Sequence, residues 1–279
     1  MSKYVYLNHK YVNYKNAKIH IEDRGFQFSD SVYEVIKVIN GKLLDIEFHL
    51  SRLKYSTSEL NFNFKINKPS LKNIFLSLLK KNQLKNGIIY LQITRGIQPR
   101  EHAYKKTLKP NIIIYTAKKK FNLPDKNYKG YKAITYPDIR WGRPDIKTTS
   151  LLANILAATE ASKQGAYETI LVKGKKVTEA AHSNVWIVRG KKIITHPANK
   201  EILKGVTRTV LKKIINSLNL KLIEREFSIK ELMKAEEVFI TSSGSLVTPI
   251  TQVDKININK GKIGAITKSL ALNLYKAII

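Results

Sequence analysis

Short apolar segments of two different periodicities alternate along this 279-residue chain, and this alternation most limits the folds open to it. Residues 71–79 carry apolar side chains at helical spacing, and Pro69 just upstream is typical of a helix start. Residues 88–94 and 111–116 have the composition of strands. A helix is again expected at 206–218, among further strands. The mixture in both halves predicts an α/β or α+β fold with two domains.

Turn and capping residues indicate several connections between these elements. Residues 4–14 and 32–44 each predict a hairpin, the second with Asn40-Gly41 in a tight turn. Ser228 and Glu231 have the spacing of a capping box and predict a short helix.

A polar stretch separates the two halves of the chain. Residues 119–129 contain Pro124 and few apolar side chains, which is typical of a linker. We therefore predict an N-terminal α/β domain at 1–118, a linker at 119–129 and a C-terminal domain at 130–279.

The composition narrows the class of protein. The formal net charge of +29 comes from 41 lysines and only nine arginines, which are spread over the whole length. Because nucleic-acid sites favour arginine and concentrate their charge, we expect a lysine-rich surface, with nucleic-acid binding as the less favoured alternative. The sequence has no cysteine and no apolar run near the roughly 20 residues of a membrane span, so we expect a cytoplasmic protein without a membrane partner.

Two places have the local character of phosphate sites. Gly205, Val206 and Thr207 stand where a helix is expected to begin, and free N–H groups at such a start attract anions. Ser242 and Ser243 follow an expected strand with hydroxyl groups and flexible backbone. The six histidines are scattered without a metal-binding spacing, and no metal site is predicted.

Several segments, taken in order, resemble the class IV, fold-type IV aminotransferases that use pyridoxal phosphate. They cover nearly the whole chain and comprise residues 22–34 (EDRGFQFSDSVYE), 49–53 (HLSRL), 145–147 (DIK), 177–184, 203–208 (LKGVTR), 238–243 and 248–249. The resemblance implies a two-domain α/β fold with the cofactor held between a smaller N-terminal and a larger C-terminal domain.

The resemblance also implies roles for individual residues. Lys147 would form the Schiff base with the cofactor and then move the substrate's α-proton in a ping-pong exchange. Glu179 would pair with the pyridine nitrogen, and Arg52 would bind the phosphate. The remaining cofactor contacts would come from Ser183, Val206, Thr207, Ser242 and Ser243.

The loop at residues 95–102 resembles that of the D-amino-acid-specific members of the family. There Arg100 and His102, together with Tyr33 of the first motif, would hold the substrate carboxylate, and Tyr90 would complete the substrate site. The family places this loop across a subunit interface, which implies a homodimer. The alternatives within the family are a branched-chain L-amino-acid aminotransferase and an aminodeoxychorismate lyase. Residues 180–182 (AAH) depart from the D-specific pattern.

Overall fold

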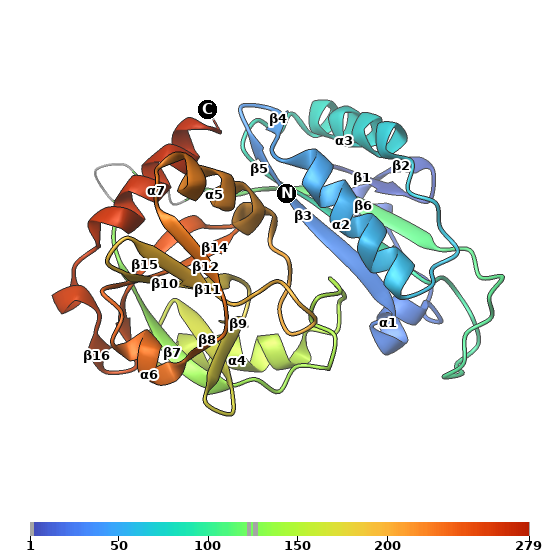
Figure 1. Cartoon of the computed structure of the whole chain (residues 1–279). Helices are drawn as coiled ribbons and strands as arrows, with labels where there is room; N and C mark the ends of the chain where they lie inside the picture. The colour runs from blue at the N-terminus through green and yellow to red at the C-terminus, as the bar shows by residue number, and fades with distance from the viewer. Residues whose placement is uncertain (1–2, 122–123, 125–127, 279) are drawn as a thin grey trace. The chain divides into compact units, whose positions relative to one another are not determined.

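The computed structural model describes residues 3–121, 124 and 128–278. Contacts within the chain define two compact units, and Figure 1 labels most of their helices and strands. The first contains Met1–Lys120 and the segment Ile146–Ser150, and the second contains Phe121–Asp145 and Leu151–Ile279. The predicted linker includes residues 122–123 and 125–127, which lie outside the described residues, and the predicted domain bounds stay a prediction.

The first unit is built on a six-stranded antiparallel sheet in the order β2-β1-β6-β5-β3-β4. The strands are β1 (Tyr4–Leu7), β2 (Lys10–Asn13), β3 (Ser31–Ile39), β4 (Lys42–Leu43), β5 (Gly87–Thr94) and β6 (Asn111–Lys118). The helices are η1 (Tyr14–Asn16), α1 (Arg24–Phe28), α2 (Ile46–Glu59) and α3 (Lys68–Asn82).

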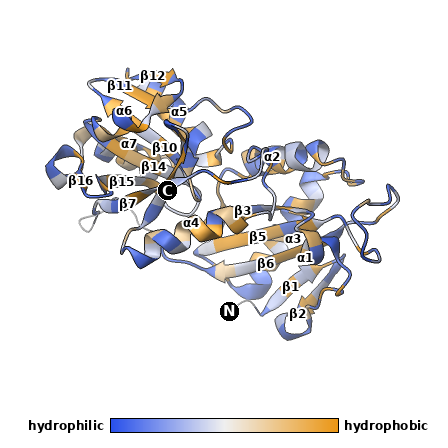
Figure 2. Ribbon diagram, turned by 90° about the horizontal axis from the view of Figure 1, so that it is seen from below, coloured by the Kyte–Doolittle hydropathy of each residue, from blue (hydrophilic) through white to orange (hydrophobic). Residues whose placement is uncertain are grey.

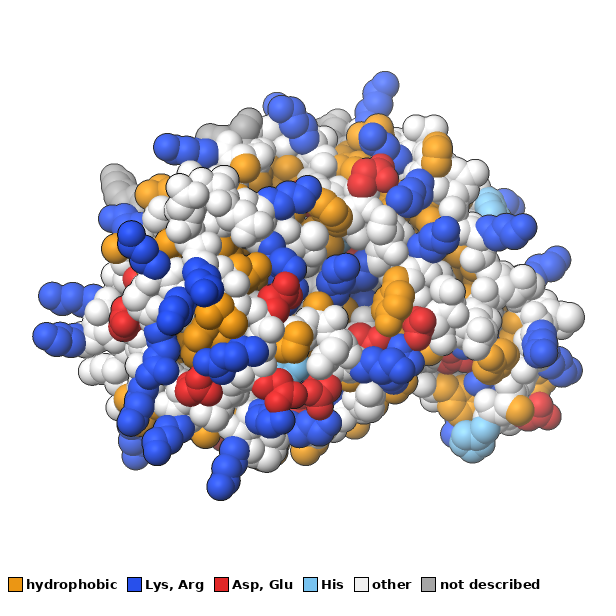
Figure 3. Space-filling view, viewed as in Figure 1, with side chains coloured by type: hydrophobic (Ala, Val, Ile, Leu, Met, Phe, Trp, Pro, Cys, Tyr) orange, Lys and Arg blue, Asp and Glu red, His pale blue; other side chains and the backbone are white. Residues whose placement is uncertain are grey.

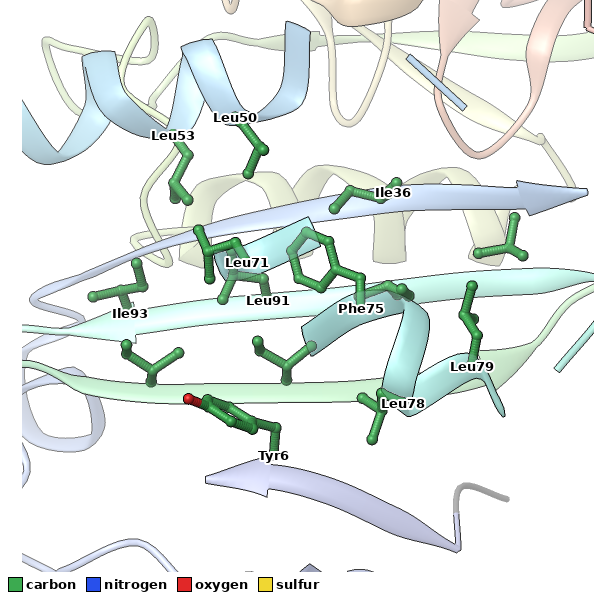
Figure 4. Packing of buried hydrophobic residues seen from close by; sticks show 14 of the residues in the cluster. Tyr6, Ile36, Leu50, Leu53, Leu71, Phe75, Leu78, Leu79, Leu91 and Ile93 are labelled. Atoms are coloured by element: carbon green, nitrogen blue, oxygen red, sulfur yellow. The ribbon is translucent and has the colours of Figure 1, made fainter. Parts of the chain in front are cut away.

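Two helices bury one face of this sheet. Leu50 and Leu53 of α2 and Phe75 of α3 belong to one buried cluster with Ile36 of β3 and Leu91 of β5, as Figure 4 shows. Since side chains alternate across a strand, residues 33 and 35 of β3 point to the opposite face. The sheet therefore separates an apolar, helix-covered side from a second side.

Local signals account for several of these elements. Asn40 and Gly41 have φ values of 50° and 76°, which Asn-Gly adopts readily, and they confirm the predicted hairpin. The side chain of Asn67 accepts from Ser70 N at the start of α3, where Pro69 stands in the first turn. The predicted helix at residues 71–79 is thereby confirmed.

The second unit contains a ten-stranded mixed sheet in the order β12-β11-β10-β14-β15-β7-β8-β9-β13, with β16 paired to β15. Its strands are β7 (Tyr131–Pro137), β8 (Glu168–Lys173), β9 (Lys176–Ala180), β10 (Asn184–Arg189), β11 (Lys192–Thr195), β12 (Lys221–Glu224), β13 (Phe227–Ser228), β14 (Glu237–Ser242), β15 (Leu246–Val253) and β16 (Ile256–Asn257). Its helices are α4 (Leu152–Lys163), α5 (Val206–Ser217), α6 (Ile229–Met233), η2 (Asn259–Gly261) and α7 (Ala265–Lys276).

Alternation along the strands gives this second sheet two buried sides. Trp186 of β10 and Phe239 of β14 share one cluster with Leu211 of α5 and Leu270 of α7, whereas the next residues along these strands, Ile187 and Ile240, belong to another. Figure 2 shows the hydrophobic residues concentrated in such central strands.

Some elements have no clear local signal. The N-cap residue of α2, Asp45, makes no side-chain capping bond, so the start of this helix depends on packing against β3. The sequence pattern likewise does not predict α7. The predicted capping box of Ser228 and Glu231 is confirmed at α6. In the part of the chain that the structure describes, no helix has the length and apolar character needed to span a membrane.

Candidate active site

Lys147 belongs to the first unit, where its short segment runs beside β3. Its carbonyl oxygen accepts from Tyr33 N at 3.0 Å, and its own N–H donates to the Ser56 hydroxyl at 3.1 Å. The neighbouring residues Val32 and Thr148 form an antiparallel bridge. The Nζ atom lies 4.0 Å from the centre of the Tyr33 ring. Tertiary contacts to β3 and α2 thus fix the backbone of this lysine.

Arg52 belongs to a buried ionic cluster on the helix-covered side of the first sheet. Its Nε and Nη2 atoms each donate to a Glu34 oxygen at 2.8 Å, and His49 Nδ1 lies 2.6 Å from the Glu34 Oε2 atom. Glu34 is fully buried; burial would raise its pKa, but Arg52 and His49 outweigh this effect and lower the pKa to about 2. Glu34 therefore carries a charge that orients Arg52.

The ring of His49 is also nearly fully buried. Burial lowers the pKa of His49, and the positive charges of Arg52 and Lys147 add to this effect against the opposing Glu34 carboxylate. A neutral imidazole must then donate through Nδ1, because the charged carboxylate can only accept.

Tyrosine rings line the opposite face of this sheet. The rings of Tyr33 and Tyr90 are stacked with their centres 5.8 Å apart, and Tyr115 continues the stack at 4.9 Å from Tyr90. The Tyr90 hydroxyl donates to Gln92 at 2.8 Å, and burial raises its pKa. The structure thus brings Tyr33, Tyr90 and Lys147 to one part of the first unit.

Arg100 and His102 lie on an exposed loop after β5. Both approach the Phe28 ring: the Arg100 guanidinium carbon lies 4.6 Å and the His102 ring 5.5 Å from its centre. The buried side chain of Arg24 donates to the carbonyl oxygens of Glu101 at 2.6 Å and His102 at 3.0 Å. The hydrogen bonds from Arg24 therefore hold the loop on which Arg100 and His102 lie close together.

Glu179 lies on β9 in the second unit and is almost fully buried. Arg140 donates to its Oε1 atom, Leu203 N donates to the same atom at 3.1 Å, and Asn184 Nδ2 donates to Oε2 at 2.9 Å. Burial nevertheless raises the pKa of Glu179 to about 7, against the lowering effect of Arg140. Burial and these three donors thus act in opposite directions on the charge of this carboxyl group.

Arg140 is itself held in place by several acceptors. Its Nε and Nη2 atoms donate to the Asp138 oxygens at 2.9 and 2.7 Å, and Nη2 also donates to the Glu201 carbonyl at 3.1 Å. The Thr178 hydroxyl donates to Asp138 at 2.7 Å, next to Glu179 in sequence. Arg140 therefore cannot move without breaking the bonds that position Glu179.

Helix α5 begins three residues after Leu203, whose N–H donates to Glu179. Its N-cap residue Gly205 provides no side-chain cap, and the first turn holds no acidic residue. A Cβ atom at Gly205 would lie 2.2 Å from the Asn184 Oδ1 atom, so this position requires the close approach that glycine permits. Val206 and Thr207, both buried, form the first turn. Their N–H groups precede the first α-helical bond, which makes this helix start suited to an anion.

Ser183 and Ser242, two further predicted residues of the second unit, hydrogen-bond to neighbouring side chains. Ser183 donates to the buried Glu168 carboxylate at 3.0 Å, and the exposed His182 approaches the same carboxylate at 2.7 Å. Ser242 shares a hydroxyl contact of 2.8 Å with Ser245 at the end of β14, and Ser243 is half-buried in that turn.

Sequence reasoning did not assign roles to Glu34, Asp138 or Arg140. Glu34 and His49 stand inside the quoted motifs, and this was the only signal available for them. Arg140 pairs with Asp138 two residues earlier, but this spacing does not predict its contact with Glu179, which forms only through the pairing of β7, β8 and β9.

Comparison with known proteins identifies the family. The family model described as amino-transferase class IV matches residues 31–253. The chain is 39% identical over 276 residues to a D-alanine aminotransferase of Staphylococcus epidermidis, covering 98% of this chain and 97% of the relative. It is 37% identical over 276 residues to a D-alanine aminotransferase of Bacillus licheniformis, covering 99% and 97%. The chain belongs to the class IV aminotransferases.

Solved structures agree with this assignment at the level of the fold. A branched-chain aminotransferase of Escherichia coli superposes on this class IV aminotransferase with a TM-score of 0.91 at 22% identity, covering 99% of this chain and 94% of that one. The branched-chain aminotransferase of Thermobaculum terrenum in its PLP form gives 0.89 at 22% identity, covering 100% and 94%. The predicted two-domain α/β fold of type IV is confirmed.

Proposed function

We propose that this class IV aminotransferase uses pyridoxal phosphate to exchange amino groups between a D-alanine-like amino acid and a 2-oxoglutarate-like acid. The observation that carries the proposal is the whole-length similarity to relatives named D-alanine aminotransferase, at 37–39% identity over 98% of the chain. The loop that presents Arg100 and His102 together supports the choice of a D-amino acid.

The residues of the second unit fit the cofactor. A carboxyl group with a pKa of about 7 can share a proton with a pyridine nitrogen, and Glu179 is such a group, held by Arg140 and Asn184. The N–H groups of Val206 and Thr207 would receive the phosphate, with the hydroxyl groups of Ser242 and Ser243 as further donors. We assign Ser183 to the same site because it directly precedes Asn184, which donates to Glu179.

The first unit supplies the reacting amine and an oriented cation. Lys147 would be the covalent attachment point and, once displaced, the base that moves the proton from the substrate Cα. Arg52 would bind the phosphate with a guanidinium that Glu34 holds in one orientation. Pyridoxal phosphate, when bound, supplies an electron-accepting ring for the electrons released at Cα.

The substrate carboxylate would be bound by Arg100, His102 and the Tyr33 hydroxyl. A guanidinium binds a carboxylate through two parallel hydrogen bonds, and this anchor decides which enantiomer presents its α-hydrogen to the lysine. Tyr90, stacked on Tyr33, would shape the same pocket.

A homodimer is part of the proposal. The single chain leaves large apolar side chains in water, including Phe26 with 76% and Ile21 with 74% of their surface exposed in the first unit, and Leu152 with 71% in the second. Ile155 and Leu156 follow Leu152 on α4 by three and four positions and are also exposed, so the three side chains share one side of the helix. A contiguous apolar patch of this kind is typical of a surface that packs against another subunit.

The basic composition does not favour a nucleic-acid partner. Figure 3 shows lysine and arginine side chains dispersed over the viewed face, with acidic side chains between them. Recognition of nucleic acid generally requires a concentrated basic patch. The cytoplasmic location stays a prediction from composition.

The test uses the purified protein supplied with pyridoxal phosphate. We expect D-alanine to change the cofactor's absorbance and L-valine to leave it unchanged, and Lys147→Ala to abolish the response. As a matched control, Lys163→Ala changes an exposed lysine at the end of α4, outside the assigned set, and should behave as the wild type. A response to L-valine alone would refute the D-specific assignment. Failure to bind the cofactor at all would refute the proposed function.

A further inference from the structure

Three side chains distant in the sequence meet at one edge of the second sheet. Strands β11 and β12 are parallel neighbours, with Thr195 opposite Glu224. His196 and Glu226 follow these strands, so the topology brings them to the same edge. Glu201 lies in the loop between β11 and α5. One ligand atom from each of His196, Glu201 and Glu226 can be chosen so that all three lie within 4.8 Å of one another.

The histidine of this cluster has an unused ring nitrogen. His196 is 1% exposed, and its Nδ1 atom lies 2.9 Å from the Pro197 carbonyl oxygen, which can only accept. Nδ1 must therefore carry the proton, which leaves a lone pair on Nε2 in the neutral ring. Among the residues that the structure describes, none hydrogen-bonds to Nε2, although Glu201 Oε2 lies 3.5 Å away.

This arrangement is typical of histidines that bind metal ions. A ligating histidine usually donates its other N–H to a backbone carbonyl, as His196 does to Pro197. Tetrahedral zinc sites have neighbouring ligand atoms about 3.3 Å apart, close to the 3.5 Å between His196 and Glu201. Glu226 is half-buried, and one of its ligand atoms already lies within 4.8 Å of those of His196 and Glu201.

We propose that His196, Glu201 and Glu226 form a zinc site, with water completing the coordination. One imidazole and two carboxylates favour Zn²⁺ over Mg²⁺ or Ca²⁺, which prefer oxygen ligands alone. The sequence predicts no metal site, because the three residues share no local spacing. The proposal is independent of the aminotransferase activity.

Two lysines of the hairpin β8–β9 occupy the position of a competing cation. Lys173 Nζ lies 2.9 Å from Glu201 Oε1, and Lys176 pairs with Glu226. Both lysine side chains are largely exposed, at 65% and 60%, so a zinc ion can displace them at small cost. Removing a lysine that competes with the ion should therefore strengthen zinc binding.

The ion would restrain the loop between β11 and α5, which also donates a hydrogen bond to Glu179. Leu203 N donates to Glu179, and the carbonyl of Glu201 accepts from Arg140. A zinc ion on the Glu201 side chain would therefore stabilise the segment between β11 and α5, and we expect the melting temperature of the protein to rise when Zn²⁺ is added.

The test is calorimetric titration of the tag-free protein, loaded with pyridoxal phosphate and freed of metal, with zinc chloride. We expect one ion per chain. Glu201→Gln and Glu226→Gln should each weaken binding by about ten- to a hundredfold, whereas the control Glu47→Gln, which removes an exposed glutamate paired with Lys68, should not change it. Lys176→Met should tighten binding about two- to fivefold, because it removes the competing cation.

Visible absorption with Co²⁺ in place of Zn²⁺ reports the same site spectroscopically. The absence of saturable zinc uptake would overturn the proposal. Zinc uptake that persists unchanged in both glutamine variants would also overturn it, because the ion would then bind elsewhere.

Discussion

Replacing Glu34 by glutamine tests the central electrostatic claim about the first unit. The pKa of this buried carboxyl falls from 4.5 to about 2 on folding, since Arg52 and His49 outweigh the effect of burial. A carboxyl whose pKa is lowered by folding stabilises the protein above its unfolded pKa, by about 3 kcal/mol at neutral pH. Glu34→Gln should lose at least this amount, because it also leaves the buried Arg52 charge without its carboxylate.

The sign of the pH dependence makes the prediction specific. Below pH 4.5 the unfolded chain takes up a proton at Glu34 that the folded protein still excludes, so the stabilisation falls steadily toward pH 2. The difference in unfolding free energy between wild type and variant should therefore shrink by about 2 kcal/mol between pH 7 and pH 3.

Urea unfolding followed by circular dichroism measures this difference. Both tryptophans, Trp141 and Trp186, lie in the second unit, so tryptophan fluorescence follows that unit and serves as an internal reference. Glu47→Gln should cost less than about 0.5 kcal/mol at either pH, since its partner Lys68 is exposed. A difference between wild type and Glu34→Gln that stays constant from pH 7 to pH 3 would refute the lowered pKa.

Three further predictions concern the candidate active site. Arg140→Met should raise the pKa of Glu179 above about 7 and weaken cofactor binding about tenfold for each unit by which that pKa rises. Equilibrium dialysis across about pH 6 to 9 measures this binding, and an unchanged pH profile would contradict the prediction. Gly205→Ala should destabilise the protein by about 1–3 kcal/mol in thermal unfolding, because the new methyl group would collide with Asn184, and a neutral effect would show that α5 can shift. Arg100→Ala should raise the KM for D-alanine by about ten- to a hundredfold in steady-state kinetics, and an unchanged KM would remove this arginine from the substrate site.

Much of the local structure could be predicted from neighbouring residues. The Asn40-Gly41 turn and the capping box of Ser228 and Glu231 are short-range requirements, because each backbone group is satisfied by a residue at most three positions away. Helix α2 has no such signal, since Asp45 makes no capping bond and the helix depends on its burial over the sheet.

The candidate site likewise has some features that the sequence predicts and others that only the folded chain shows. Linked motifs in a fixed order were enough to identify the family, and with it the expected roles of Lys147 and Glu179. The course of the Lys147 segment beside β3 and the contact of Arg140 with Glu179 became visible only in the folded chain. Burial and ion pairing depend on strands and helices far apart in the sequence, and local patterns therefore do not encode them. Nothing in the residues next to Glu179 indicates that its pKa is about 7.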